Sequence, residues 1–392
     1  MRSGLEVLLD SRLDLVSGLA VGLCCNHTAV DRELRHAIDL LLAKGVKLVR
    51  LFGPEHGVRA TAQDMETVDE HKDPVTGLPT VSLYGTTEAS LHPREEDLAD
   101  LDVLLFDVQD VGARYYTYQA TLGYLMEVCG RLGKRVIVLD RPNPIDGVTI
   151  EGNLVQPGFE SFIGAYPIAV RHGMTVGELA LFFGENCEVA CDVTVVPCEG
   201  WDRTKWYDET DLPWVFPSPN MPTLDAATVY PGTCLIEATN LSEGRGTTRP
   251  FHRIGAPWLD PQRLTALCEA SAAKAGLEGV RFRPDAFVPG FQKHAGKHCA
   301  GIEIHVTNRR KLDAFLLGLV VVEACRNADP ERFGWRKEPY EFVSDPPAID
   351  LLTGSAEFRT VLEAGGDIRE LMSVWKPQLA AFVEQRRPCL LY

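Results

Sequence analysis

The sequence has no long apolar run, no excess of positive charge and no C-x-x-C motif. Its longest uncharged apolar run, Ala314–Val322, is much shorter than the ~20 residues that a membrane-spanning helix needs. The 39 Lys and Arg residues stand against 55 Asp and Glu residues, which gives a net charge of −16. Such a surface repels polyanions, so we expect no nucleic-acid partner and no membrane partner.

The 11 cysteines lie mostly inside apolar runs, where a reduced thiol behaves as a small apolar side chain. The first residues include Glu6 and Asp10 and lack the apolar core of a secretory signal. We therefore expect a cytoplasmic protein, or an extracytoplasmic one if a leader has been removed. The length of 392 residues, with 45% apolar and 24% charged residues, is typical of two globular domains.

The first 145 residues alternate short apolar runs with amphipathic segments. The apolar runs end near Cys25, Phe52, Phe106 and Leu139. The amphipathic segments include Asp31–Gly45, in which we expect the first residue to be the helix N-cap. Apolar strands separated by helices indicate an α/β domain whose parallel sheet is covered on both faces.

Polar side chains follow four of these predicted strands. Parallel strands end at one edge of the sheet, and ligands bind at that edge in open α/β folds. We therefore expect a ligand site there, formed by some of the residues Asn26, His27, Glu55, His56, Asp107, Asp110, Asp140, Arg141 and Asn143.

The pattern changes in the second half of the chain. Trp201–Trp258 is rich in Pro, Gly and aromatic residues and has little periodicity, which predicts a long ordered excursion. Shorter strands and the buried helix Lys311–Asn327 follow. We place a domain boundary near residue 226, with a sheet domain over residues 1–226 and a smaller α+β domain over residues 227–392.

Motifs for common cofactors are missing. There is no G-x-G-x-x-G loop after the first strand, no Walker A loop and no G-x-S-x-G elbow. His294 and His298 have the spacing of a ligand pair, but their segment contains a glycine and lacks the usual glutamate, so a surface loop is favoured over a metal site. We expect neither a metal nor a cofactor.

Two clusters of polar residues carry candidate chemistry. Pro54 and the flanking glycines of Gly53–Gly57 predict a rigid turn that presents Glu55 and His56 after a buried strand. A half-shielded carboxylate there suits a general acid, although it could equally cap the next segment. The second cluster, Glu237–Thr247, is either a hydrogen-bonding site for sugars or carboxylates, or a solvated loop. Opposed carboxylates without a cofactor motif favour glycoside hydrolysis.

Several motifs resemble those of one known family, the exo-β-N-acetylmuramidases, which release N-acetylmuramic acid from the non-reducing ends of peptidoglycan fragments. The resemblance runs from about Gly18 to Tyr392. It is carried by Leu51–Gly57, Phe106–Gly112 with Arg114–Tyr118, Asp140–Pro144, Arg171–Thr175, Pro219–Thr223, and Tyr230–Gly232 leading into Glu237–Thr247.

The resemblance implies a Rossmann-like N-terminal domain and a smaller auxiliary domain with the active site between them. It places catalytic carboxylates on Glu55 and Glu243, and a small amino-sugar substrate such as MurNAc-GlcNAc in the cleft. Substrate-binding residues expected from the motifs and the sheet edge are Asn26, His56, Arg59, Asp107, Asp110, Arg114, Tyr116, Asp140, Arg171, His172, Asn220, Glu237, Asn240 and Arg245.

Some features depart from the family pattern or leave alternatives open. Cys25, Ala60 and Ala238 replace the family's usual Thr, Gly and Gly. A non-catalytic sugar- or muropeptide-binding clamp is one alternative, and an amidase or esterase that uses Cys25 or Ser242 is another. The choice between retention and inversion depends on a carboxylate separation that a sequence does not contain, and the oligomeric state stays open.

An anionic substrate needs a local cation on so acidic a chain. The lactyl carboxylate distinguishes N-acetylmuramic acid from N-acetylglucosamine, and the planar fork of Arg matches a carboxylate. We rank Arg245 first, because glycines flank it, and Arg59 second. Arg114 and Arg171 are further candidates.

Overall fold

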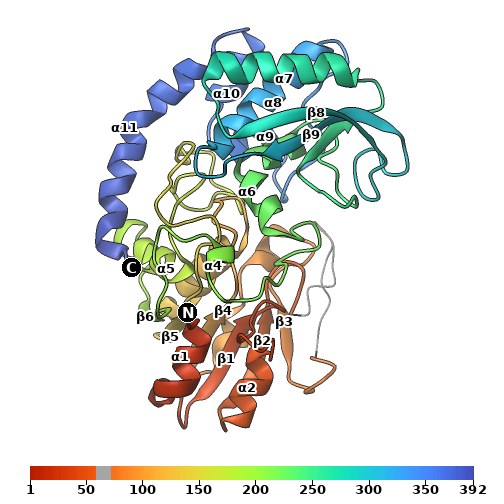
Figure 1. Ribbon diagram of the computed structural model, residues 1–392. Helices are drawn as coiled ribbons and strands as arrows, with labels where there is room; N and C mark the ends of the chain where they lie inside the picture. The colour runs from red at the N-terminus through yellow and green to blue at the C-terminus, as the bar shows by residue number, and fades with distance from the viewer. Residues whose placement is uncertain (59–71) are drawn as a thin grey trace.

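A six-stranded parallel sheet forms the centre of the N-terminal domain in the computed structural model, which describes residues 1–58 and 72–392 (Figure 1). The strand order is β3-β2-β1-β4-β5-β6, and all neighbours pair in parallel. This confirms the predicted α/β class and its Rossmann-like sheet. The strands are β1 (Ala20–Cys25), β2 (Lys47–Gly53), β3 (Thr80–Ser82), β4 (Val103–Asp107), β5 (Arg135–Leu139) and β6 (Asp192–Val196).

Helices cover both faces of this sheet. Leu105 and Ile137 pack in one apolar cluster with α1 (Gly4–Ser11) and α2 (Ala37–Ala43). Their neighbours Leu104 and Val136 pack in another cluster with α4 (Tyr118–Arg131) and α5 (Val176–Asn186). Successive side chains of each strand thus point to opposite faces, which explains why the strands read as continuous apolar runs. The short helix α3 (Glu95–Leu98) precedes β4.

The prediction that Asp31 caps α2 is wrong. Its carboxylate accepts hydrogen bonds from the backbone N–H groups of Glu33 (3.1 Å) and Arg35 (2.8 Å), and Leu34 has a positive φ of 61°. This local turn delays the helix. His36 is the actual cap, because its Nδ1 accepts from the backbone N–H group two residues later at 3.2 Å.

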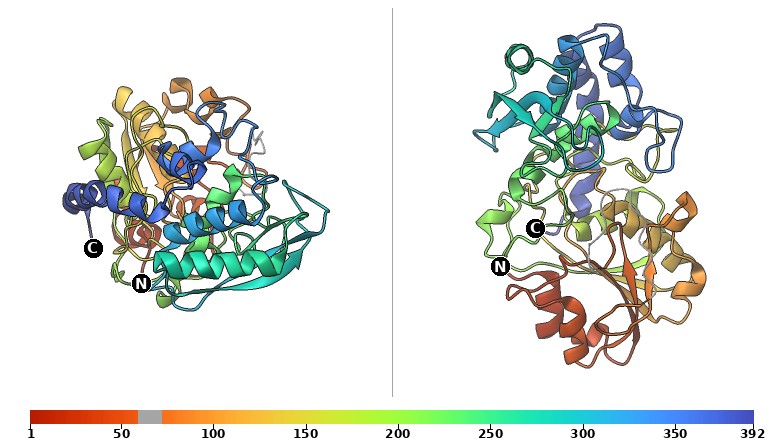
Figure 2. Two further views of the ribbon diagram at one scale, coloured as in Figure 1. Left: turned by 90° about the horizontal axis from the view of Figure 1, so that it is seen from above. Right: turned by 90° about the vertical axis from the view of Figure 1, so that its right-hand side faces the viewer.

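The C-terminal domain contains a three-stranded antiparallel sheet of order β7-β9-β8. Figure 2 shows this domain stacked on the first one. Its strands are β7 (Arg253–Ala256), β8 (Val280–Phe287) and β9 (Cys299–Val306), and its helices are α7 (Pro261–Ala275), α8 (Ala314–Ala328), α9 (Ala348–Thr353) and α10 (Glu357–Glu363).

A helix that the sequence pattern did not predict, α6 (Leu224–Thr233), lies inside the Pro- and Gly-rich excursion. Pro231 and Gly232 in its last turn hide the helical pattern. The boundary that we placed at residue 226 falls in the first turn of this helix, not in a linker.

The last helix, α11 (Ile368–Arg386), leaves the C-terminal domain and runs along one side of the molecule, so that the C-terminus lies near α5 (Figure 1). The hydroxyl of Tyr392 donates to Asp140 Oδ2 at 2.6 Å, and the backbone N–H of Leu391 donates to Glu178 Oε1 at 2.8 Å. The final residues of the predicted second domain therefore pack against the first domain.

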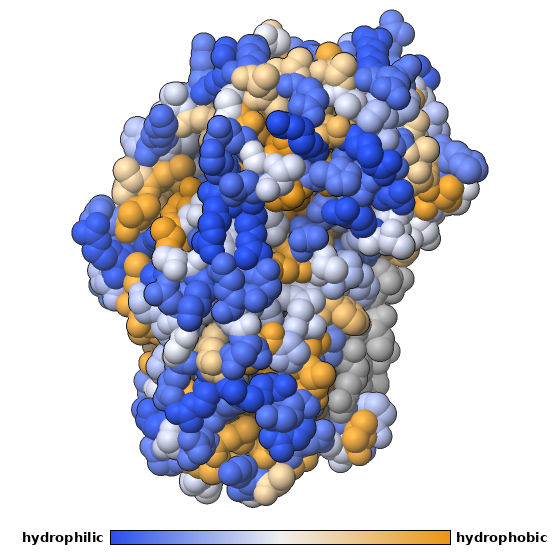
Figure 3. Space-filling model, in the orientation of Figure 1, coloured by the Kyte–Doolittle hydropathy of each residue, from blue (hydrophilic) through white to orange (hydrophobic). Residues whose placement is uncertain are grey.

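Hydrophilic side chains cover most of the face drawn in Figure 3, and apolar ones are scattered between them over both domains. Within residues 1–58 and 72–392, no helix combines the length and the apolar character needed to cross a membrane.

Two glycines allow α6 and α8 to touch backbone to backbone. A Cβ atom built on Gly232 would lie 1.8 Å from the carbonyl oxygen of Ala314, and one built on Gly318 would lie 2.1 Å from the carbonyl oxygen of Gly232. Real Cβ atoms do not approach so closely, and backbone atoms cannot move aside as a flexible side chain can. The crossing fixes the direction in which the chain leaves α6.

We expect Gly318→Ala to lower the free energy of unfolding by roughly 1–3 kcal/mol, because the added methyl group forces the two helices apart. Gly184→Ala in α5 is the control: Gly184 is exposed and only one backbone atom, at 3.8 Å, lies near its Cβ position. That substitution should stabilise by about 0.5–1 kcal/mol through helix propensity. Urea unfolding measures both, and equal effects would contradict the close crossing.

Candidate active site

A narrow pocket lies where the two domains meet. It brings together five of the predicted site residues: Glu55, His56, Tyr116, Glu237 and Arg245. Aromatic side chains form much of the remaining wall. The other lining residues are Tyr115, Thr117, Tyr118, Ile163, Ser218, Met221, Tyr230, Phe251, Tyr340 and Glu341.

Glu55 reaches this pocket from the tight turn that follows β2. The backbone N–H of Gly57 donates to the carbonyl of Pro54 at 2.9 Å, and His56 has a φ of 72°, a left-handed conformation that is uncommon outside glycine. Glu55 is 5% exposed, and its Oε2 accepts from the hydroxyl of Thr117 at 2.7 Å. Its other oxygen, Oε1, is buried without a hydrogen-bond partner in the described part of the chain.

Glu237 enters the same pocket from the C-terminal domain, on the short 3₁₀ helix η4 (Cys234–Ala238) that continues α6. Its Oε1 accepts from Arg245 Nη2 at 2.6 Å, and its Oε2 accepts from the hydroxyl of Tyr340 at 2.7 Å. Hydrogen bonds from a cation and a hydroxyl stabilise the ionised form of a carboxylate. Glu237 is therefore held as a buried anion beside the pocket.

Glu243, the second predicted catalytic residue, does not line the pocket. Its Oε1 accepts from Arg245 Nε at 3.0 Å, and its Oε2 forms an ion pair with Lys293 at 2.9 Å. Burial alone would raise the pKa of Glu243, but Lys293 and Arg245 outweigh burial and hold the pKa below its usual range. Arg245 lies between the two carboxylates, and only Glu237 faces the pocket.

Tyr340 and Glu341 are pocket residues that the sequence analysis missed. They lie on a tight turn in which the backbone groups of Tyr340 and Val343 exchange hydrogen bonds of 2.8 and 2.9 Å. The two central residues, Glu341 and Phe342, have φ values of 45° and 69°. Such turns usually contain Asn and Gly, so Glu-Phe gives no signal. The hydroxyl of Tyr84 donates to Glu341 Oε2 at 2.9 Å and links this turn to the sheet domain.

Three further predicted residues lie buried at the carboxyl edge of the sheet. The side-chain oxygen of Asn26 accepts from Thr28, while Asp110 Oδ2 accepts from the backbone of Gly112 at 2.7 Å and lies 3.6 Å from His172 Nε2. Asp110 contributes to raising the pKa of Tyr116, although burial is the main cause. The predicted sheet edge therefore lies close to the pocket, although these three residues do not line it.

Asp107 and Asp140 have protein partners instead of an open ligand site. Asp107 pairs with Arg141 at 2.5 and 3.1 Å. Asp140 instead accepts hydrogen bonds from Thr175, Gly177 and Tyr392, and burial raises its pKa to about 6.

Arg114 and Arg171 are also used inside the protein. Arg114 is fully buried and donates to the carbonyls of Asn153, Ile168 and Leu352. Its guanidinium thus supplies hydrogen bonds that these buried carbonyls would otherwise lack.

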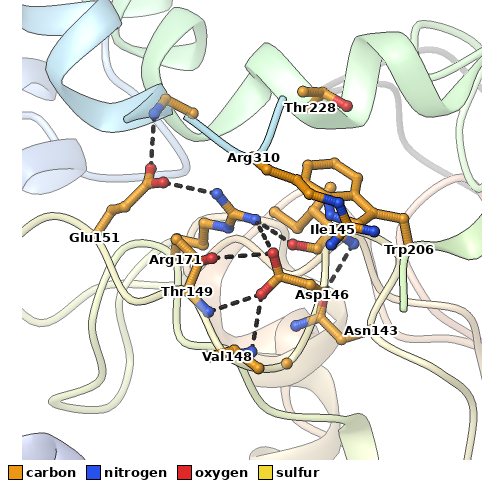
Figure 4. Close-up of polar contacts among 12 residues, drawn as sticks. Asn143, Ile145, Asp146, Val148, Thr149, Glu151, Arg171, Trp206, Thr228 and Arg310 are labelled. Atoms are coloured by element: carbon orange, nitrogen blue, oxygen red, sulfur yellow. Dashed lines mark hydrogen bonds and ion pairs between the residues drawn. The ribbon is translucent and has the colours of Figure 1, made fainter. Parts of the chain in front are cut away.

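Arg171 is the centre of a network between the domains (Figure 4). Its guanidinium donates to Glu151 Oε1 at 2.7 Å and to Asp146 Oδ2 at 2.9 Å. Glu151 Oε2 in turn accepts from the backbone N–H groups of Ala314 (2.8 Å) and Phe315 (3.1 Å) at the start of α8. The network therefore ties the first helix turn of one domain to the loops of the other.

The remaining predicted residues fall into three places. Asn220 lies in the sequence between the pocket residues Ser218 and Met221 but does not line the pocket itself. Its Oδ1 accepts from the backbone N–H of Gly246 at 3.2 Å. Asn240 lies in a separate groove, where its side chain bonds to the backbone of Arg332 and Gly334. Arg59 is outside the described residues. In the part of the chain that the structure covers, no group of three or more His, Cys, Asp or Glu side chains is arranged for a metal ion.

The parallel sheet and the smaller domain with its antiparallel sheet define a two-domain α/β protein whose candidate site lies where the domains meet. Family models described as exo-β-N-acetylmuramidase NamZ, N-terminal and C-terminal, match residues 21–225 and 228–392. The chain therefore belongs to the exo-β-N-acetylmuramidase family, and it is a glycosidase.

Known proteins resemble this chain over its full length. The chain is 41% identical over 393 residues to the peptidoglycan β-N-acetylmuramidase NamZ of Bacillus subtilis (strain 168), with 100% of this chain and 91% of the relative covered. It also resembles the crystal structures of two DUF1343 family proteins from Bacteroides fragilis NCTC 9343. Their TM-scores are 0.88 at 34% identity and 0.77 at 29% identity, with 100% of this chain and 98% of each relative covered.

A further carboxylate, that of Asp313, lies beside the network of Arg171. Asp313 caps α8 by accepting from the backbone N–H of Leu316 at 2.8 Å. Burial, and after it the nearby charge of Glu151, raise the pKa of Asp313 well above its usual range. A carboxylate whose pKa is raised by folding must ionise at a cost in the native state, so its contribution to stability is lost as the pH rises from about 4 to about 7.

We expect Asp313→Asn to keep the cap, because Asn is also a good N-cap residue, and to remove this pH-dependent loss. The stability of the variant relative to the wild type should rise between pH 4.5 and pH 8, measured by urea unfolding. Asp260→Asn is the control, since Asp260 caps α7 in the same way through Arg263 at 2.9 Å. An Asp313→Asn difference that does not change with pH would contradict the expectation.

Proposed function

We propose that this protein is an exo-acting glycoside hydrolase that releases N-acetylmuramic acid from the non-reducing end of peptidoglycan fragments such as MurNAc-GlcNAc. The observation that carries the proposal is Glu55, with one buried oxygen unpartnered in the described structure, in a pocket that also holds the anion of Glu237. The relative from B. subtilis, which is named a peptidoglycan β-N-acetylmuramidase, supports the same substrate class.

In this proposal Glu55 is the general acid. Thr117 holds one carboxyl oxygen, and the rigid turn after β2 fixes the backbone, so that Oε1 is left to give a proton to the glycosidic oxygen. As the bond breaks, positive charge develops at the anomeric carbon, and the anion of Glu237 stabilises it. Arg245 and Tyr340 keep Glu237 in place.

The stereochemistry of the product distinguishes two roles for Glu237. A carboxylate that attacks the anomeric carbon gives the β-anomer of N-acetylmuramic acid first, whereas one that activates water gives the α-anomer first. Proton NMR of the first product formed from a β-linked substrate therefore identifies which role Glu237 has.

The pocket and the surface favour dissolved substrates with a free terminal sugar. A narrow pocket with aromatic walls accepts a terminal sugar more readily than the middle of a chain, which suits exo-cleavage. The net charge of −16 disfavours adsorption to an anionic cell wall. We infer that soluble fragments are the substrates.

Among the four arginines considered for the lactyl carboxylate, Arg245 is the one that lines the pocket within the described residues. Glu237 and Glu243 already occupy two of its nitrogens. We assign it mainly to holding Glu237 in place.

The amidase or esterase alternative lacks support at the site. Cys25 is fully buried at the end of β1, and the hydroxyl of Ser242 accepts from the backbone N–H of Gly244 at 3.1 Å. Neither lines the pocket. The remaining alternative, a binding protein without catalysis, predicts no turnover of any muramic substrate.

We expect Glu55→Gln to lower kcat on MurNAc-GlcNAc by roughly 10²–10⁴-fold, the usual contribution of a positioned acid, while the fold is unchanged. Release of N-acetylmuramic acid, followed by chromatography, measures the rate, and circular dichroism checks the fold. Glu33→Gln, at an exposed glutamate outside the pocket, is the matched control and should have wild-type activity. A loss of kcat below about tenfold for Glu55→Gln would show that another residue is the general acid.

We expect Glu237→Gln to lower kcat by roughly 10²–10⁴-fold and Glu243→Gln to lower it much less. Glu243→Gln should instead lower the free energy of unfolding by roughly 3–5 kcal/mol, because Lys293 and Arg245 lose a buried partner. Steady-state kinetics and urea unfolding of both variants provide the comparison. A larger kcat loss for Glu243→Gln, with both proteins folded, would make Glu243 the partner of Glu55.

A further inference from the structure

A second groove, much larger and more open than the pocket, lies in the C-terminal domain, with a volume of about 680 Å³. Volumes of this size are typical of ligand sites. The chain that brings Glu237 to the pocket continues directly into this groove, where Thr239 and Asn240 line it. The groove therefore begins beside the residues that we assign to catalysis.

The groove is positively charged on an otherwise acidic protein. Lys293, Arg332, Arg336 and Lys337 line it, against one acidic residue, Glu338. Lys293 is paired with Glu243, and Arg332 with Asp329 at 2.7 Å. Lys337 is exposed and has no ion-pair partner in the described part of the chain. The groove thus offers positive charge to an anionic ligand.

Aromatic rings lie beside these cations. Phe333 and Trp335 line the groove, with ring centroids 5.2 Å apart at an angle of 80°. The indole N–H of Trp335 donates to Glu363 Oε1 at 2.8 Å, which fixes the ring plane. An ordered aromatic face packs well against the apolar C–H face of a sugar ring. Aromatic rings beside cations match a carbohydrate that carries carboxylates.

Arg336 connects the groove to the pocket. Its guanidinium lies over the ring of Tyr340, 5.0 Å from the centroid, and Tyr340 donates to Glu237 inside the pocket. The backbone N–H of Arg336 donates to the carbonyl of Ala238 at 2.8 Å. A ligand that extends from the pocket would meet the groove within a short distance of the scissile bond.

We propose that this groove binds the leaving-group side of a longer acidic glycan, with sugar rings against Trp335 and Phe333 and carboxylates near Lys337 and Arg332. The proposal rests on the proposed function, because it places the first sugar of the same chain in the pocket. It makes the enzyme more efficient on longer peptide-free glycans than on the disaccharide.

The test compares two substrates with the same scissile bond, the disaccharide MurNAc-GlcNAc and the tetrasaccharide MurNAc-GlcNAc-MurNAc-GlcNAc. The wild type should have a KM on the order of 10-fold lower for the tetrasaccharide. Trp335→Ala should remove most of that preference, on the order of 10-fold. Lys337→Ala should reduce it by about 2- to 5-fold at low salt, as expected for an exposed charge. Both variants should cleave the disaccharide at the wild-type rate.

Lys376→Ala is the matched control, because Lys376 is an exposed lysine on α11 that does not line the groove. It should keep the full preference. If Trp335→Ala does not fold, Lys337→Ala still tests the proposal, since its side chain is exposed.

The outcomes separate this proposal from the proposed function. If the enzyme cleaves neither the disaccharide nor the tetrasaccharide, the proposed function is overturned. The groove proposal would be overturned if the enzyme cleaved the disaccharide and showed no preference for the tetrasaccharide. A preference that survives both substitutions would also overturn it. Preference for a disaccharide that carries an acidic stem peptide, but not for the tetrasaccharide, would assign the groove to a peptide and also overturn the proposal.

Discussion

One buried carboxylate, Glu151, ties the two domains together. It bonds to Arg171 within the sheet domain and to the first backbone N–H groups of α8 in the other domain. A buried ion pair that loses one partner leaves an uncompensated charge, which is strongly unfavourable. The network therefore permits few alternative orientations of the domains. The contact of α6 with α8 then carries this constraint to η4, where Glu237 lies.

The proposed site exists only when both domains are in place. Glu55 comes from the turn after a strand of the sheet, and Glu237 comes from the helix that continues α6. Arg245 and Tyr340, which hold Glu237, both belong to the second half of the chain. Each carboxylate thus has its own local support, and the packing between the domains brings them to one pocket. The sheet provides the frame for Glu55, and the auxiliary domain completes the chemistry.

Much of the sheet domain could be predicted, because apolar strands and helical periodicity are local signals. The turn that carries Glu55 was also visible, since Pro and Gly at fixed places define it. Contacts between residues that are distant in the sequence could not be predicted. The motif around Arg171 predicts a ligand-binding residue, but in the structure its guanidinium forms ion pairs with Glu151 and Asp146. The Tyr340 turn has residues that disfavour its backbone conformation, and it becomes apparent only in the structure, where tertiary contacts such as that of Glu341 with Tyr84 hold it.

The central claim is that Glu55 and Glu237 act on one sugar in the pocket between the domains. A crystal structure of the Glu55→Gln variant with bound MurNAc-GlcNAc tests it most directly. The account predicts the muramic ring in the pocket, the glycosidic oxygen within ~2.6–3.2 Å of the side chain of residue 55, and the anomeric carbon facing Glu237. A disaccharide bound with its glycosidic oxygen far from residue 55, or with Glu243 at the anomeric carbon, would contradict it.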